Sequence, residues 1–225
     1  MFSRLKLLVN DDIEKLHNAN VIIFGVGGVG GYVAEMLARS GIGHITIVDY
    51  DTIDISNKNR QIIALDSTIK KNKVDVWKSR MLDINSELEV TAINEKLLKD
   101  NIESFNLKNY DYIIDAIDMV ASKISLIDYA HKNNIDVISA MGAGNRLSIP
   151  ECVIGDIYET SNDGLAKVLR QNLRKLGIKR HQVVYFKNKS ISLGETRTIG
   201  SVAYYPAISG AMLSAKVIND LLCKN

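Results

Sequence analysis

Short apolar runs alternate with amphipathic stretches along the first 140 residues. The runs at 20–24, 44–50, 88–93, 110–115 and 135–140 have the length of buried strands. The stretches at 29–40, 66–82 and 122–132 have the length and the apolar spacing of helices. This alternation predicts an α/β fold, with a Rossmann-like, doubly wound and mostly parallel sheet that has helices on both faces.

The final third of the chain has a different pattern. Residues 151–157 and 183–186 predict two more strands, and a helix capped by Asn162 or Asp163 and ended by Gly177 lies between them. Residues 187–200 predict a mobile loop, 207–222 a closing helix, and 1–18 a short helix-forming arm. Because the 225 residues contain no repeat or low-complexity linker, we expect one domain, in which 151–225 form the substrate-binding part.

A glycine-rich turn follows the first apolar run, with Gly25, Gly27, Gly28 and Gly30. A strand, a glycine turn and a helix start together form an anion site, because backbone N–H groups point outward there and the missing Cβ atoms let a phosphate approach closely. The next strand ends at Asp49, about 20 residues further on, where a carboxylate would bind ribose hydroxyls. This stretch predicts nucleotide binding, but it does not distinguish NAD from ATP.

The composition, with 46% hydrophobic and 24% charged residues, is that of a water-soluble protein. Neither a signal peptide nor an 18-residue apolar stretch is present, so we expect a cytoplasmic protein with no membrane partner. Cys152 and Cys223 form no CxxC zinc clamp, so we expect no structural zinc. We expect Cys152 to be a small core residue and Cys223 an exposed, inert thiol.

The net charge of +2 is unevenly distributed. Residues 165–194 carry eight Lys and Arg and no Asp or Glu, which leaves 20 basic against 26 acidic residues elsewhere. On the predicted helix, Lys167, Arg170 and Arg174 share the face opposite the leucines, and Arg180 continues the positive run. This segment predicts an anionic macromolecular partner, with a merely solvated surface as the alternative.

Several polar groups converge on the carboxyl edge of the predicted sheet: Asp49, the loop 51–61 with Arg60, Lys73 and Asp118. A dehydrogenase has no need for an arginine, a lysine and a further aspartate around the phosphates. A triphosphate needs cations for its charge and a carboxylate for Mg²⁺. The charges therefore favour ATP over NAD, although Asp49 and Asp118 could also be solvated turn residues and Arg60 a surface arginine.

These motifs, in this order, resemble those of the ubiquitin-activating-enzyme superfamily, which includes the adenylating enzymes of thiamine and molybdopterin synthesis. They are the glycine turn, Asp49-Tyr50-Asp51, Ser56-Asn57-Lys58-Asn59-Arg60-Gln61, Lys73 and Asp115-Ala116-Ile117-Asp118. Within the superfamily, segments 139–145 and 156–161, the basic helix and the arm with Arg4 are similar to the tRNA threonylcarbamoyladenosine dehydratases. This extends the resemblance to nearly the full length.

The resemblance implies a role for each matching residue. The glycine turn would pack against the phosphates of ATP, Asp49 would bind the ribose, and Asp118 would hold Mg²⁺, with a monovalent cation (K⁺ or Na⁺) as a further expectation. The remaining nucleotide ligands would be Asp51, Ser56, Asn57, Asn59, Arg60 and Lys73. Arg4 would reach into the partner subunit's site of a homodimer, so the expected catalytic residues are Arg4, Arg60, Lys73 and Asp118.

The implied activity is ATP-dependent dehydration of the threonylcarbamoyl group of N6-threonylcarbamoyladenosine in tRNA, by adenylation and then cyclisation. The alternatives are an adenylyltransferase that activates the C-terminal glycine of a small sulfur-carrier protein, a sulfur-transfer partner of a cysteine desulfurase, and a regulatory nucleotide-binding module without turnover. Carrier activators often carry two CxxC pairs, which this chain lacks, and Met119 stands where they have asparagine. Both departures favour the tRNA branch.

Overall fold

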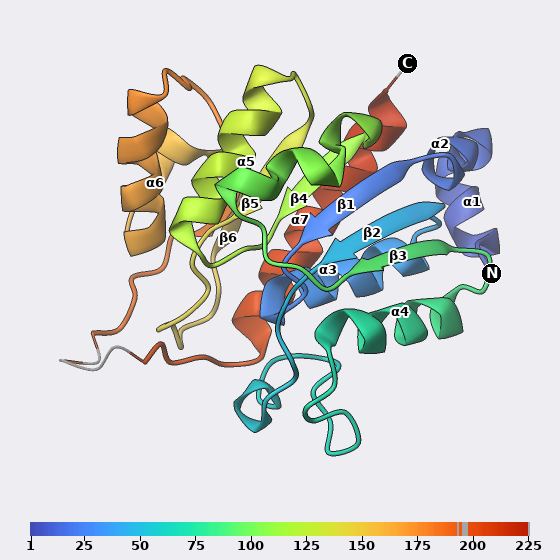
Figure 1. Cartoon of the computed structure of the whole chain (residues 1–225), viewed down its shortest axis with the longest axis horizontal. Coiled ribbons are helices and arrows are strands. Elements are labelled where there is room, and N and C mark those ends of the chain that lie inside the picture. Colours follow the sequence, from blue (N-terminus) through green and yellow to red (C-terminus); the bar gives the residue numbers. More distant parts are fainter. Residues whose placement is uncertain (193, 195–197, 225) are drawn as a thin grey trace.

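The computed structural model describes residues 1–192, 194 and 198–224. In this part of the chain, a seven-stranded sheet has the order β3-β2-β1-β4-β5-β7-β6 (Figure 1). The pairs from β3 to β7 are parallel, whereas β6 and β7 are antiparallel. The predicted mixed and mostly parallel sheet is therefore confirmed. Its strands are β1 (Asn20–Phe24), β2 (His44–Val48), β3 (Glu89–Ile93), β4 (Tyr112–Asp115), β5 (Val137–Ala140), β6 (Cys152–Asp156) and β7 (Gln182–Phe186).

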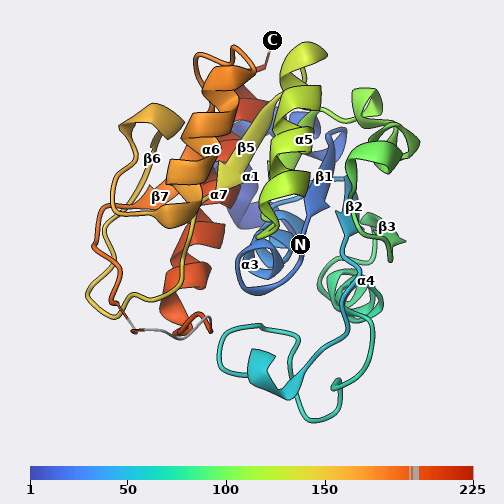
Figure 2. The ribbon, with the colours of Figure 1, turned by 60° about the vertical axis from the view of Figure 1, so that its left-hand side comes forward.

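Helices cover both faces of this sheet (Figures 1 and 2). One face carries α3 (Gly28–Arg39), α4 (Lys73–Ile84) and α7 (Tyr204–Cys223), and the other carries α5 (Val120–Lys132) and α6 (Gly164–Lys175). In β1, Val21 and Ile23 join the core under α3 and α7, whereas Ile22 and Phe24 join the core under α5. A strand buried on both faces needs apolar side chains at every buried position, which explains the continuous run from Val21 to Phe24.

The N-terminal arm lies at the amino edge of the sheet. It consists of α1 (Ser3–Val9), the 3₁₀ turn η1 (Asn10–Asp12) and α2 (Ile13–His17). The Gly43 N–H, just before β2, donates to the Leu16 carbonyl, and the rings of Phe2 and His17 lie 5.6 Å apart. α2 buries two residues, but α1 buries none. The arm therefore lies opposite the edge where the parallel strands end.

The helix expected at 66–82 was wrong in its first part, because α4 begins only at Lys73. The preceding backbone has non-helical partners: the Thr68 hydroxyl accepts from Leu65 N–H and donates to the Ile63 carbonyl, and Lys70 has φ +68°. These side-chain hydrogen bonds compete with a helix start. The other elements match their predictions within a few residues at the ends, which are the least sharply defined positions of any element.

Several connections form 3₁₀ turns that the sequence pattern did not indicate. They are η2 (Ile55–Asn57), η3 (Lys99–Phe105), η4 (Leu107–Asn109) and η5 (Ile157–Glu159). The described residues of 187–200 contain no helix or strand, and the prediction of mobility for Leu193 and for residues 195–197 lies outside the described residues. No helix in the described ranges is both long and apolar enough to cross a bilayer.

Candidate functional site

A cavity of about 620 Å³ lies along the carboxyl edge of the sheet. It is lined by the loops that follow six of the strands, β1 to β5 and β7, together with the start of α7. The structure therefore brings together most of the residues predicted for nucleotide binding, including Gly25, Gly27, Gly28, Asp49, Asp51, Asn57, Arg60, Lys73 and Asp118.

The glycine turn between β1 and α3 is built for close backbone contacts. Gly25 has φ +83°, and a Cβ atom there would lie 2.8 Å from the Ala116 carbonyl oxygen, in the loop after β4. A Cβ at Gly30 would lie 1.8 Å from the Gly25 carbonyl oxygen, so Gly30 is buried behind the turn instead of lining the cavity. Within the described residues, no side chain caps α3 at Gly27. The first N–H groups of the helix are thus left for an anion.

Asp49 fixes the turn from the end of β2. Its carboxylate accepts hydrogen bonds from Val26 N–H at 2.8 Å and from Asp51 N–H at 2.9 Å. Burial raises the pKa of this carboxyl group, although Lys73 and the two N–H donors oppose the shift. Since a carboxylate has about four acceptor positions, Asp49 can also accept from ribose hydroxyls.

Lys73 brings a buried cation to the floor of the cavity. Its side chain is 6% exposed, and its Nζ atom lies 2.7 Å from Asp51 Oδ2 and 3.9 Å from Asp49 Oδ1. The start of α4 therefore holds an ammonium group beside the two carboxylates at the end of β2. A phosphate group entering the cavity would meet this ammonium without a large movement of the side chain.

Arg60 is positioned by its own loop. Its Nη1 atom donates to the Ser56 carbonyl and to Asn59 Oδ1, both at 2.9 Å. Asn59 in turn donates to the Ser201 carbonyl at 3.0 Å. Ser56 and Asn59, predicted as nucleotide ligands, are not among the cavity-lining residues; they hold Arg60 in place.

Asp118, in the loop after β4, lines the cavity and is exposed there. Among the described residues there is no group of three or more acidic, histidine or cysteine side chains that could hold a metal ion. A single carboxylate still fits Mg²⁺, which proteins usually bind through one or two carboxylates together with substrate phosphates. Asp118 is the residue that would serve in this way.

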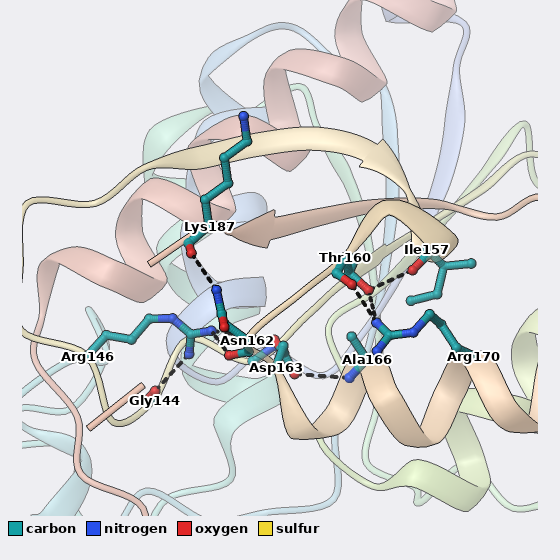
Figure 3. Close-up of polar contacts among 10 residues, drawn as sticks. Gly144, Arg146, Ile157, Thr160, Asn162, Asp163, Ala166, Arg170 and Lys187 are labelled. Carbon is teal, nitrogen blue, oxygen red and sulfur yellow. Dashed lines mark hydrogen bonds and ion pairs between the residues drawn. The ribbon is translucent and has the colours of Figure 1, made fainter. Parts of the chain in front are cut away.

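The other predicted site residues lie away from the cavity. Arg4 is exposed on α1, at the amino edge. On α6, Lys167 and Arg174 are exposed, and Arg180 follows in the next loop with a side chain 91% exposed. Arg170 lies on the same side of α6 but is only half-exposed, and its Nη1 atom donates to the carbonyl and the hydroxyl of Thr160, so the expectation that all three cations project freely was wrong for this residue (Figure 3).

A buried polar network under the cavity was not found from the sequence. The Lys123 Nζ atom lies 2.7 Å from Asp115 Oδ2, and both side chains are 0% exposed. The Ser139 hydroxyl donates to the same carboxylate at 2.6 Å and lies 2.8 Å from His181 Nε2. Since the serine proton points to Asp115, His181 donates from Nε2, and its Nδ1 accepts from His131, 3.2 Å away.

Burial, with the nearby charges of His131 and Lys123, lowers the pKa of His181 to about 3, so this ring is neutral. Gln61 was also missed: it lines the cavity, and its Oε1 atom is buried without a partner among the described residues. Burial raises the pKa of the half-buried Cys152 to about 12, and Cys223 is exposed at the end of α7. Cys152 therefore packs against the edge of the core and is not fully inside it, and the exposure of Cys223 matches the prediction.

Both the sequence and the fold are similar to those of known proteins. A model of the ThiF family matches residues 3–218. The chain belongs to the ThiF family. This ThiF-family protein is 40% identical to the tRNA threonylcarbamoyladenosine dehydratase of Bacillus subtilis, over 98% of its own length and 94% of the relative's. It is 35% identical to the Escherichia coli protein of that name, over 91% and 74% of the two chains.

Solved structures extend the similarity to three dimensions. The E. coli tRNA N6-threonylcarbamoyladenosine dehydratase in complex with ATP has a TM-score of 0.91 and 30% identity, with 98% of this chain and 93% of that chain covered. The structure of the same protein with AMP has a TM-score of 0.90. The molybdopterin-synthase adenylyltransferase of Haemophilus influenzae is a more distant relative, with 30% identity over 75% of this chain and 69% of its own.

Proposed function

We propose that this ThiF-family chain is an enzyme that uses ATP to dehydrate N6-threonylcarbamoyladenosine in tRNA to its cyclic form. The observation that carries the proposal is the cavity at the carboxyl edge, where a glycine turn, Arg60, Lys73 and Asp118 surround one space. The B. subtilis and E. coli relatives named above have this activity in their names, and the one from E. coli has been crystallised with ATP and with AMP.

The chemistry begins with a poor electrophile. The threonyl carboxylate of the modified base has no leaving group, so one of its oxygens bonds to the α-phosphorus of ATP and pyrophosphate departs. The carbamoyl oxygen of the same side chain then bonds to the acyl carbon, AMP leaves with the original carboxylate oxygen, and the carbamoyl N–H proton goes to solvent. Because both reacting groups belong to one side chain, the ring closes without an enzyme nucleophile. This agrees with the high pKa of Cys152.

The residues of the cavity have distinct roles in this proposal. The open N–H groups of α3 bind phosphate oxygens, Lys73 and Arg60 neutralise the polyphosphate, and Asp49 holds the ribose. Mg²⁺, held by Asp118, would screen the charge that repels an incoming carboxylate. Lys73 changes partner from Asp51 to phosphate when the nucleotide binds.

A pyrophosphate exchange assay tests this function. The protein is incubated with ATP and labelled pyrophosphate, together with tRNA that carries the modified base, with a small sulfur-carrier protein, or with neither. We expect exchange only with the tRNA, and none with Asp118→Asn, whose thermal unfolding should match that of the wild type. Exchange with the carrier protein alone would support the adenylyltransferase alternative. If calorimetry showed that the protein binds NAD and not ATP, both the dehydratase and the adenylyltransferase functions would be ruled out.

We also propose a homodimer in which Arg4 completes the partner subunit's site. Two features support this: α1 buries no residue of its own chain, with Leu7 and Leu8 81% and 82% exposed, and the arm lies at the edge away from its own cavity. Mixing Arg4→Ala with Asp118→Asn subunits should restore about one active site in each mixed dimer. If the mixture stays as inactive as its parents, each site is built within one chain.

The exposed cations of the C-terminal part supply a docking surface for tRNA in this proposal. Lys167, Arg174, Arg180 and Lys187 are all exposed, and a phosphate backbone gains affinity from such a surface by counterion release. We treat residues 1–225 as one cytoplasmic adenylating domain, with 151–225 as the tRNA-binding part. Two further expectations are activation by K⁺ or Na⁺ and docking of a cysteine desulfurase or sulfur acceptor. Both can be tested when the cation or the protein is added to the pyrophosphate exchange assay.

A further inference from the structure

The cavity has two ends that belong to different parts of the sheet. The strand order places the loop after β3 at one end and the loop after β5 at the other, with β2, β1 and β4 between them. With strands about 4.8 Å apart, the two ends are separated by roughly 19 Å. The end beside β5 is lined by Ala143, Gly144, Ile199 and Ser201.

These two ends differ in chemistry. The cations and carboxylates suited to a nucleotide lie from β2 to β4, at Asp49, Lys73 and Asp118, and the glycine turn follows β1 between them. At the far end the lining residues Ala143, Gly144, Ile199 and Ser201 include no carboxylate. Arg60 lies beside this end, because Asn59, which accepts from Arg60, donates to the Ser201 carbonyl. The carboxylate that attacks the α-phosphorus is not part of the nucleotide, so it needs its own place in the cavity. An end with no carboxylate among its lining residues offers that place without a competing anion.

Hydrogen bonds of Asn145 connect the two loops that form the far end. Asn145 donates from its N–H to the Gly200 carbonyl at 2.8 Å, and its Oδ1 accepts from Gly200 N–H at 2.6 Å. Its carbonyl accepts from Ile191 N–H at 2.6 Å. The loop after β5 is thereby fastened to both sides of the loop after β7, which brings Ile199 and Ser201 to the cavity.

A buried arginine ties this end to helix α6 (Figure 3). Arg146 is 5% exposed, and it donates to the Gly144 carbonyl at 3.1 Å and to the Asn162 carbonyl at 3.0 Å. Asp163 lies 3.9 Å from Arg146; it accepts from Gly142 N–H at 2.8 Å and, as the cap of α6, from Ala166 N–H at 3.0 Å. The cavity wall and the start of α6 therefore form one hydrogen-bonded unit.

We propose that the end of the cavity formed by Ala143, Gly144, Ile199 and Ser201 receives the acyl substrate, the carboxylate-bearing side chain of the modified tRNA base. Arg146 and Asp163 are positioning residues: they hold this end of the cavity at a fixed place relative to α6, which carries Lys167 and Arg174. This inference rests on the proposed function. It adds where the second reactant enters and which buried residues align the bound tRNA with the nucleotide.

Gly144→Ala tests the entrance, because the added Cβ would lie 2.2 Å from Ile199 Cγ2 and would narrow this end. Gly164→Ala is the matched control, since a Cβ at Gly164 meets nothing within 4 Å. Ala143→Leu fills the same end without touching Gly144. For each variant, ATP affinity is measured by calorimetry and tRNA affinity by filter binding. The rate of tRNA-dependent pyrophosphate exchange measures activity, and thermal unfolding checks that the variant is folded.

Both blocking variants should keep ATP and tRNA affinities within about twofold of the wild type and lose at least about tenfold in exchange, because misplacement of a reacting group by 1 Å can cost up to about 100-fold. Arg146→Lys should lower kcat by about tenfold and leave the KM for tRNA unchanged. If Gly144→Ala and Ala143→Leu also lost ATP affinity, this end of the cavity would belong to the nucleotide site. If they exchanged pyrophosphate at the wild-type rate, the assignment of this end to the acyl substrate would be overturned. A wild type without tRNA-dependent exchange would overturn the proposed function itself.

Discussion

The Asp115–Lys123 pair offers a sharp test of what holds the site together. Replacing Lys123 with methionine keeps most of the side-chain volume on α5 but removes the ammonium group from a site that is 0% exposed. Asp115 would retain two donors, the Ser139 hydroxyl at 2.6 Å and Ile117 N–H at 3.2 Å. Its negative charge would have no counter-charge within contact distance among the described residues.

Breaking a buried ion pair in this way costs about 3–5 kcal/mol, because one desolvated charge is left uncompensated. Domains are stable by only about 5–15 kcal/mol, so the loss is a large part of the total. With a urea m-value of about 3 kcal/mol/M, the unfolding midpoint should fall by at least about 1 M. The double variant Lys123→Met/Asp115→Asn removes both charges and should cost less than Lys123→Met alone.

Equilibrium unfolding in urea measures these differences through Trp77, the only tryptophan, which is 0% exposed and donates to the Val26 carbonyl at 3.0 Å. Lys132→Met is the matched control on the same helix. Lys132 is 68% exposed and pairs with Asp128 one turn away, so its loss should cost below about 0.5 kcal/mol. A cost below about 1 kcal/mol for Lys123→Met, or simple additivity in the double variant, would refute the reasoning.

Two further predictions concern tRNA and pH. Lys167→Ala/Arg174→Ala should weaken tRNA binding and flatten the slope of log K against log salt by about 1 to 2 units, because phosphate contacts are lost. Arg170→Ala should leave that slope unchanged and lower the urea midpoint, since this guanidinium binds Thr160. His181 is neutral when folded, with a pKa of about 3 against 6.5 for the ordinary side chain. The unfolded chain therefore binds a proton first as the pH falls, and the free energy of unfolding should decrease between pH 6.5 and 3 by up to about 1.4 kcal/mol per unit. His181→Gln should flatten that decrease in urea titrations at pH 7, 6 and 5, and an unchanged pH profile would assign the acid sensitivity to other groups.

The nucleotide edge could be predicted because its signals are local in the sequence. A buried strand followed by glycines needs no distant information, and Asp49 and Asp118 come directly after strands or close behind them. Parallel strands then bring their carboxyl ends to one edge, whatever the details of packing. The fold and the cavity follow from these two facts.

The parts that escaped prediction depend on contacts between distant elements. Lys123 has the sequence context of an exposed helix lysine, and only the packing of α5 on β4 shows that it is buried against Asp115. Arg170 shares its helix face with Lys167 and Arg174, but the chain that follows η5 places Thr160 where the guanidinium of Arg170 donates to it. Helical periodicity gives the direction of a side chain, but not what the rest of the chain places there.

The strand order has a consequence for synthesis on the ribosome. β6 precedes β7 in the chain, yet in the described sheet it pairs only with β7, which separates it from β5. A nascent chain must therefore wait for residues 182–186 before β6 can join the sheet. The cavity wall made by Pro206, against Gly28, is added later still, when α7 docks on α3. A prematurely terminated chain would thus carry the glycine turn, Asp49, Lys73 and Asp118 but lack the wall that closes the cavity over Gly28.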